Sequence, residues 1–231
     1  MGCGESKEEK AAKAKAAAEA KAAAEAKAAA DWKVIEAAIH ETFKTLNIRA
    51  RLPRQPTKAD LEKVTIVLLD FKKLTEVPKG LEKLTQLTYL SLVGNQLTDV
   101  KGLENLTQLT VLALGGNKLT NVKGLENLTQ LTELWISINQ LTDVTGLEKL
   151  TQLTFLNLAR NQLTEIPNGL EKLTQLTKLN LSQNELTDVK GLENLTQLKH
   201  LNLNDNPALT KAQIDELQKA LPNCDIDHNA K

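Results

Sequence analysis

The sequence predicts an α/β solenoid, in which short strands from successive repeats form one parallel sheet. The first observation is a string, G-L-E-[NK]-L-T-Q-L, that recurs at spacings of 22, 22, 22, 23 and 22 residues. The second is an L-x-L alternation after each string, with the period of two that is typical of a strand. The third is an asparagine just beyond each alternation. The string begins at Gly80, Gly102, Gly124, Gly146, Gly169 and Gly191.

The repeat length explains why the units must stack. A 22-residue unit with one short strand cannot bury its own leucines, whereas stacked units share a continuous core. Strands of successive units then pair in parallel, about 4.8 Å apart. The single 23-residue spacing coincides with the segment Ile166-Pro167-Asn168. We count seven strands in this repeat region.

The repeated asparagine follows each strand, where the chain turns. A buried amide must be hydrogen-bonded, so we expect its side chain to bond the backbone of the turn and of the next coil. We expect Asn139, with repeats on both sides, to stabilise the fold more than Asn206, which has a repeat on one side only. The position is occupied by Asn95, Asn117, Asn139, Asn161, Asn184 and Asn206.

The repeat resembles that of a known family. Residues 87–97 read L-T-Y-L-S-L-V-G-N-Q-L, which matches the consensus L-x-x-L-x-L-x-x-N-x-L of the leucine-rich repeat family. The 22-residue period with its Gly-Leu turn is similar to the short bacterial, internalin-like subclass. The match covers residues 61–209, although the first copy has Lys72 in place of asparagine. This resemblance implies a curved right-handed solenoid with its parallel sheet on the concave face, and protein–protein interaction without catalysis.

Helical caps are predicted at both ends of the repeats, because a terminal repeat exposes its leucine face. Upstream, apolar residues at spacings of three and four indicate an amphipathic helix. Thr57 and Asp60 resemble a capping box that opens a second, short helix. The apolar positions of the first helix are Trp32, Ile35, Ile39, Phe43 and Leu46.

At the carboxyl end, Thr210 and Gln213 form a full capping box before a helix that Pro222 stops. The segment Cys224-Asp-Ile226 can add a last strand, and we interpret Cys224 as a small buried apolar residue rather than a reactive thiol. The chain thus divides into a tail and spacer (1–31), a helical cap (32–63), repeats (64–209) and a carboxyl-terminal cap (210–231).

The amino-terminal tail differs from the rest of the chain. Residues 11–30 are mostly alanine with lysine and glutamate, the best helix formers, so we expect a helical spacer about 40 Å long. A disordered alanine-rich tail is the alternative.

The start, Met1-Gly2-Cys3, allows three interpretations. Cys3 is the acylated residue of a bacterial lipoprotein, or Gly2 is myristoylated beside a palmitoylated Cys3, or neither is modified. The first places the protein on the bacterial cell envelope; the alternative location is the cytoplasm.

The composition argues against several functions. The 29 basic residues balance 29 acidic residues, so surplus charge for binding nucleic acid is lacking. Two cysteines and three widely separated histidines predict no metal site. Because no nucleophile, zinc or phosphate-loop motif is present, we expect no enzyme and no cofactor. The repeated glutamates, such as Glu126, are interpreted as a solvated ladder.

The variable positions of the repeat carry the functional prediction. They flank each L-x-L motif and are predicted to share the concave face, opposite the leucine core. Four of the six aromatic residues lie there, and such an exposed apolar strip usually marks an interaction site. We therefore expect a protein or peptide partner. Unselected variation at solvent positions is the alternative for the strip, and a structural, self-associating envelope protein is the alternative for the whole chain. The candidate binding residues are Phe71, Tyr89, Val93, Val111, Trp135, Ile138, Phe155, Arg160, Lys178 and His200.

Overall fold

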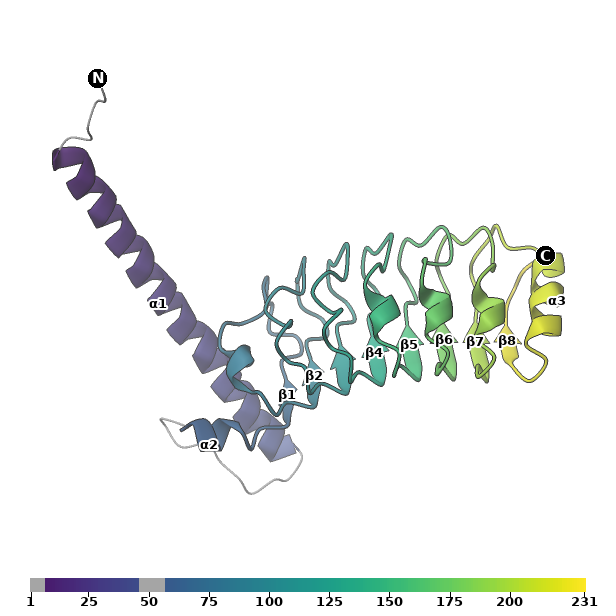
Figure 1. The fold of residues 1–231 in the computed structure, drawn as a ribbon, viewed down its shortest axis with the longest axis horizontal. Helices are drawn as coiled ribbons and strands as arrows, with labels where there is room; N and C mark the ends of the chain where they lie inside the picture. Colours follow the sequence, from purple (N-terminus) through teal and green to yellow (C-terminus); the bar gives the residue numbers. More distant parts are fainter. Residues whose placement is uncertain (1–6, 46–56) are drawn as a thin grey trace.

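The computed structural model describes residues 7–45 and 57–231, which form a solenoid with helices at both ends (Figure 1). Eight strands form one sheet in sequence order, and each pairs in parallel with the next. The predicted parallel sheet is confirmed, and the eighth strand comes from the segment after Cys224. The strands are β1 (Ile66–Leu68), β2 (Tyr89–Ser91), β3 (Val111–Ala113), β4 (Glu133–Trp135), β5 (Phe155–Asn157), β6 (Lys178–Asn180), β7 (His200–Asn202) and β8 (Asp225–Asp227).

The leucine core lies between the sheet and the turns that return the chain to it. The central residues of neighbouring strands, such as Leu90, Leu112 and Leu134, align in register and are fully buried. Burying one leucine stabilises a fold by roughly 1.5–3 kcal/mol. Since each coil supplies only a few such side chains, the stability comes from stacking, as the repeat length predicts.

The chain returns from one strand to the next through a segment that contains a short turn of glycine and glutamate. Gly124 has φ 106°, a backbone conformation that favours glycine, and its N–H donates to Oε2 of Glu126 at 2.6 Å. Backbone hydrogen bonds, from Glu126 itself and from Gly124, lower the pKa of this carboxyl. The glutamates, interpreted as a solvated ladder, thus also serve as acceptors that close the turns. Four of these segments contain a 3₁₀ turn: η1 (Leu81–Lys83), η2 (Leu147–Lys149), η3 (Leu170–Lys172) and η4 (Leu192–Asn194).

The asparagines form a buried ladder along the solenoid, as predicted. Oδ1 of Asn139 accepts the N–H of Leu119 at 3.0 Å. Its Nδ2 donates to the carbonyls of Leu114, Ile136 and Ser137 at 3.0, 3.2 and 3.2 Å. Each asparagine thus joins its own turn to the coil before it. Equivalent bonds are made by Asn95, Asn117, Asn161, Asn184 and Asn206.

The direction of these bonds corrects one expectation. Because each asparagine bonds backwards along the chain, the last one has all its partners. Asn206 accepts the N–H of Leu186 at 3.1 Å and donates to the carbonyls of Leu181 and Leu203 at 3.0 and 2.9 Å. The premise that Asn206 is bonded on fewer sides than Asn139 was therefore wrong, because the bonds go to the preceding coil and not to the next.

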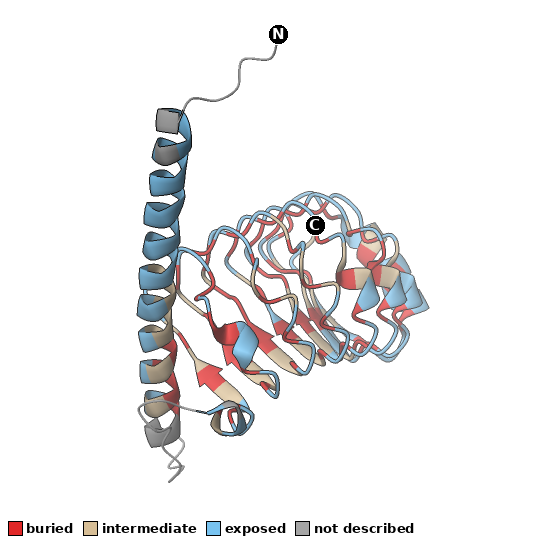
Figure 2. Ribbon diagram, turned by 60° about the vertical axis from the view of Figure 1, so that its left-hand side comes forward, coloured by how far each residue is buried: buried red, intermediate tan, exposed pale blue. Residues whose placement is uncertain are grey.

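A single helix, α1 (Lys7–Thr45), closes the amino-terminal end of the core. It runs without a break through residues 31 and 32, so the predicted spacer and cap helix are one element. Ile35 and Ile39 are fully buried, while the amino-terminal part projects from the solenoid and is exposed (Figure 2). Oγ1 of the buried Thr42 accepts the N–H of Leu68 at 3.2 Å, so α1 also covers the free edge of β1.

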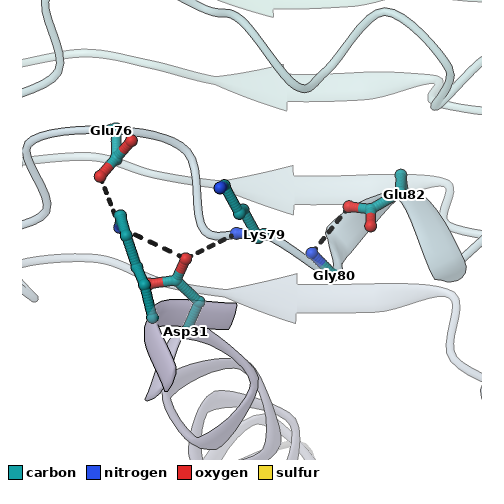
Figure 3. A network of polar contacts seen from close by, with 6 residues as sticks. Asp31, Glu76, Lys79, Gly80 and Glu82 are labelled. Atoms are coloured by element: carbon teal, nitrogen blue, oxygen red, sulfur yellow. Dashed lines mark hydrogen bonds and ion pairs between the residues drawn. The ribbon is translucent and has the colours of Figure 1, made fainter. Parts of the chain in front are cut away.

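Polar contacts join α1 to the segment between β1 and η1 (Figure 3). Nζ of Lys27 lies 2.5 Å from a carboxylate oxygen of Glu76 and 3.5 Å from one of Asp31. The same oxygen of Asp31 accepts the N–H of Lys79 at 3.1 Å. Next to Asp31, the ring of Trp32 lies beneath Nζ of Lys83 in η1, which is 5.4 Å from the ring centre. Within the described residues, no helix is both long and apolar enough to cross a membrane.

Both predicted capping boxes form. Thr57 and Asp60 exchange hydrogen bonds at the start of α2 (Lys58–Leu61), and Thr210 and Gln213 do so before α3 (Lys211–Ala220). Cys224 is buried, as predicted, and burial raises the pKa of its thiol to about 11. Three positions of interest lie outside the described residues or side chains: Cys3, Phe43 and Leu46.

Candidate functional site

The sheet register places the variable strand residues in two straight rows. We call this surface the outer sheet face; it corresponds to the concave face of the predicted solenoid. The rows run across all eight strands, so side chains from successive strands along the chain become neighbours. The first row is Ile66, Tyr89, Val111, Glu133, Phe155, Lys178, His200 and Asp225. The second row is Leu68, Ser91, Ala113, Trp135, Asn157, Asn180, Asn202 and Asp227.

An aromatic pair lies at the middle of this face. The ring of Trp135 stacks on that of Phe155, with ring centres 4.1 Å apart and planes 29° apart. Nε1 of Trp135 donates to a carboxylate oxygen of Glu133 at 3.2 Å, which satisfies the indole donor. Trp135 is still 39% exposed, whereas Phe155 beneath it is half-buried. The two rings form a fixed apolar platform rather than two separate exposed side chains.

On the amino-terminal side of the aromatic pair, the side chains of this face are smaller or more buried. Tyr89 and Val111 are half-buried, and the second row there contains the small, buried Ser91 and Ala113. The strip Tyr89, Val111, Trp135 and Phe155 therefore lies on one face, but its members are unequally exposed. Trp135 rises above the two strands before it because its neighbours there are small.

A third row follows the strands, and here the structure corrects the sequence grouping. Val93 was predicted to lie in line with Ile138 and Arg160, but it lies one residue earlier in its repeat. Phe71, Ile138 and Arg160 occupy the position before each ladder asparagine or its equivalent, with φ of 56°, 57° and 55°. The N–H of Ile138 still bonds the carbonyl of Ala159 at 2.9 Å, so this row forms the rim of the sheet.

The rim contains two very exposed apolar side chains. Phe71 is 73% exposed and Ile138 is 52% exposed. The ring of Phe71 lies against Gly94, where an added Cβ would come within 2.2 Å of it. Gly116 occupies the next position of the rim. Two glycines therefore separate Phe71 from Ile138, and Gly94 at least cannot carry a side chain while the ring stays in place.

The carboxyl-terminal half of the face is polar. Lys178 and His200 continue the first row beyond Phe155, and Arg160 follows on the rim. Nε of Arg160 donates to Oε1 of Gln183 at 2.6 Å, which orients the guanidinium. Nδ1 of His200 lies 3.8 Å from a carboxylate oxygen of Asp225. A depression of about 180 Å³ lies between the aromatic pair and this polar end, lined in part by Phe155, Lys178 and His200.

Two features of this surface could not be predicted from the repeat alignment. Trp135 and Phe155 belong to different rows, so their stacking is a diagonal contact between neighbouring strands. The hydrogen bonds of Asn157, Asn180 and Asn202, three residues that the sequence analysis did not select, also depend on local backbone geometry. Their one sequence signal was a run of asparagines in successive copies of a variable position.

Known proteins share this repeat. The family model described as leucine rich repeats (two copies) matches five overlapping segments, 85–127, 107–149, 129–172, 151–194 and 174–219. Together these segments cover more than half of the chain.

The chain belongs to the leucine-rich repeat family.

Several solved structures are similar to this chain. The crystal structure of internalin C2 from Listeria monocytogenes superposes with a TM-score of 0.62 at 25% identity, covering 85% of this chain and 92% of that one. A second Listeria monocytogenes internalin matches at 21% identity with a TM-score of 0.48, covering 86% and 88% of the two chains. A leucine-rich repeat protein of Leptospira interrogans matches at 27% identity and a TM-score of 0.44, covering 67% and 52%. The comparison with curated proteins finds no match.

The outer sheet face offers apolar contacts and hydrogen-bond donors. Leucine-rich repeat proteins generally serve as protein–protein interaction modules. On the described residues the face offers an aromatic platform, exposed apolar side chains on one rim and hydrogen-bond donors beyond them. No group of three or more His, Cys, Asp or Glu side chains that could hold a metal ion occurs within the same residues.

Proposed function

We propose that this leucine-rich repeat protein binds a protein or peptide partner on its concave face, with the Trp135–Phe155 pair as the anchor. The observation that carries the proposal is the exposure of large apolar side chains. In the described part of the chain, the most exposed of them are Phe71, Trp135 and Ile138, and all three lie on the outer sheet face or its rim. Covering such side chains with a partner removes apolar surface from water, and exposed aromatic residues are typical hot spots.

The backbone at Ile138 supports the same proposal. Its φ of 57° is a left-handed conformation that a β-branched residue rarely adopts and that costs roughly 1–2 kcal/mol. Gly94 and Gly116, the equivalent residues of the two repeats before it, avoid that cost. Because the Ile138 side chain is half exposed, folding gains little from it in return. The conformation is common to this position of the repeats, so the unusual feature is the β-branched residue, and we take binding as the reason for it.

Membrane attachment through Cys3 is the second part of the proposal. The exposed amino-terminal part of α1 would act as a spacer that holds the solenoid away from the lipid surface. Acylation of Cys3 predicts that the lipidated protein partitions into detergent and that the Cys3→Ser variant does not. Equal partitioning of both proteins into the aqueous phase would remove the anchor but leave the binding face as proposed.

The binding proposal can be tested without knowing the partner. Phage that display random 16-residue peptides are selected against the immobilised protein and, in parallel, against Trp135→Ala. We expect Trp135→Ala to weaken binding of the enriched peptides by about 2 kcal/mol, more than the roughly 0.5–1.5 kcal/mol of stability that is lost with the stacked pair. Asn127→Ala is the matched control, because Asn127 is exposed on the turn side of the solenoid. Peptides that bind Trp135→Ala as well as the parent protein would refute the anchor.

The same material tests the structural alternative. A self-associating envelope protein would enrich no peptide above background and would form oligomers in sedimentation experiments. If those oligomers disappeared in Trp135→Ala, the concave face would be a contact between copies of this chain rather than a site for another protein.

A further inference from the structure

We infer that the partner segment carries carboxylates beside its apolar anchor, and that these carboxylates lie over β5, β6 and β7. The inference rests on the proposed function, since it concerns the same concave face. It depends on an arrangement of hydrogen-bond donors on the polar half of that face.

Three asparagines on neighbouring strands have the same orientation. Oδ1 of Asn157 accepts the N–H of Ala159, Oδ1 of Asn180 accepts that of Ser182, and Oδ1 of Asn202 accepts that of Asn204, each at 3.0 Å. Each amide oxygen is thus tied to the backbone two residues ahead. The three Nδ2 groups have no partner among the described residues. The second row therefore presents donors, spaced by about 4.8 Å from strand to strand.

Cationic side chains flank these donors. Lys178 is exposed in the first row, next to Asn180 on the same strand, and Arg160 lies on the rim. Within the described residues neither cation has a carboxylate partner. The unpaired cations and the free amide donors together favour an acidic ligand.

The acceptors that a hydroxyl-rich ligand would need are partly used on these asparagines, because each Oδ1 already accepts one backbone N–H. A sugar hydroxyl both donates and accepts, so it is best bound by a mixture of donors and acceptors. Here the Oδ1 atoms are used by the backbone, and the lysine and arginine have only donors. A carboxylate only accepts, which matches this surface. We therefore favour a polypeptide with aspartate or glutamate over a carbohydrate.

Geometry limits where the carboxylates bind. The depression of about 180 Å³ adjoins Phe155 and is lined by Lys178, Asn180, His200 and Asn202, with Asp227 at its far side. Asp225 and Asp227 on β8 would repel a carboxylate placed over β8. Glu133 would repel a carboxylate placed over β4, at the other side of the depression. Carboxylates fit between these limits, one to two strand spacings, or roughly 5–10 Å, from the aromatic pair.

The peptide selection provides the test. Among peptides enriched in a Trp135-dependent way, we expect aspartate or glutamate within a few residues of an apolar side chain. The most enriched peptide is then synthesised together with an analogue in which Asn or Gln replaces its acidic residues. The amide analogue should bind the parent protein roughly fivefold more weakly, the upper range for an exposed ion pair. Raising the salt concentration should reduce the difference.

Two variants locate the effect. Lys178→Gln should weaken binding of the acidic peptide by roughly fivefold and remove most of its advantage over the amide analogue. Lys172→Gln, which removes an equal charge from exposed η3 away from the sheet, should change neither affinity. If Lys172→Gln matched Lys178→Gln, the preference would reflect overall charge, and the assigned site would be wrong.

The outcomes separate this inference from the proposed function. Enrichment that requires Trp135 but shows no acidic preference, or a basic preference, overturns the inference and leaves the binding face intact. Absence of any Trp135-dependent enrichment overturns both. Co-sedimentation with chitin or purified peptidoglycan that is lost in Asn180→Ala would also overturn the inference, in favour of a carbohydrate ligand.

Discussion

Replacing the ladder asparagines with alanine should reveal an end effect opposite to simple expectation. We predict that Asn206→Ala destabilises the protein more than Asn139→Ala, although Asn206 belongs to the last repeat and Asn139 to the middle of the solenoid. The reason lies in how carbonyl groups are shared. Along the ladder, the carbonyl of one turn accepts hydrogen bonds from two successive asparagines, so most carbonyls keep a donor when one asparagine is lost.

At Asn139 the substitution leaves a single group without a partner. The carbonyl of Leu114 keeps Nδ2 of Asn117 at 3.0 Å, and that of Ile136 keeps Nδ2 of Asn161 at 3.2 Å. The third carbonyl, of Ser137, still accepts a backbone N–H at 3.0 Å. The N–H of Leu119 loses its acceptor. One buried unsatisfied donor costs about 1–3 kcal/mol.

At Asn206 the substitution leaves two groups without a partner. The N–H of Leu186 loses its acceptor, as in the middle of the ladder. The carbonyl of Leu203 also loses its donor, because within the described residues no later asparagine shares it. The carbonyl of Leu181 keeps Nδ2 of Asn184 at 3.0 Å. The additional unsatisfied carbonyl should make the loss about 1–2 kcal/mol larger than at Asn139.

Urea unfolding followed by circular dichroism measures both losses. Gln140→Ala is the control, because Gln140 is exposed beside Asn139 and should leave the midpoint unchanged. An Asn206→Ala loss equal to or smaller than that of Asn139→Ala would show that carbonyl sharing does not decide the cost. The ladder would then act mainly through its acceptor oxygen, which both positions use in the same way.

Three further predictions concern the rim, the turns and the carboxyl-terminal cap. Ile138→Asn should raise the free energy of unfolding by about 1 kcal/mol, because asparagine tolerates the left-handed conformation, and a lower urea midpoint would contradict the strain. The lowered pKa of Glu126 means that its carboxylate stabilises the turn above its ordinary pKa of 4.5 and that this contribution is lost as the pH falls through the lowered value of the folded state. Glu126→Gln should therefore be less stable than the parent at pH 7, with the gap closing towards pH 3, and a gap independent of pH would count against the carboxylate. In a Cys3→Ser background, Cys224 should react with a disulfide reagent at pH 8 only after unfolding, because burial raises its pKa to about 11; rapid reaction of the native protein would show that it is accessible.

The sequence by itself determined the architecture of this protein. A repeat of 22 residues leaves no means of burying its leucines except stacking, so the parallel sheet, the aligned outer rows and the buried asparagines follow from spacing alone. The capping boxes at Thr57 and Thr210 are also local, since each involves residues three positions apart. The division of the outer sheet face into an apolar half and a polar half could be predicted, because period two assigns each variable residue to a face.

Only the tertiary structure decided how neighbouring coils use these positions. The stacking of Trp135 on Phe155 depends on side-chain directions across two strands, which the repeat alignment does not contain. The donors of Asn157, Asn180 and Asn202 face a ligand only because local backbone N–H groups occupy their oxygens. The backward direction of the asparagine bonds likewise appears only when adjacent coils are stacked. Contacts between coils depend on the direction of each side chain and on the shape of its neighbours. The repeat pattern specifies only which residue type occupies each position.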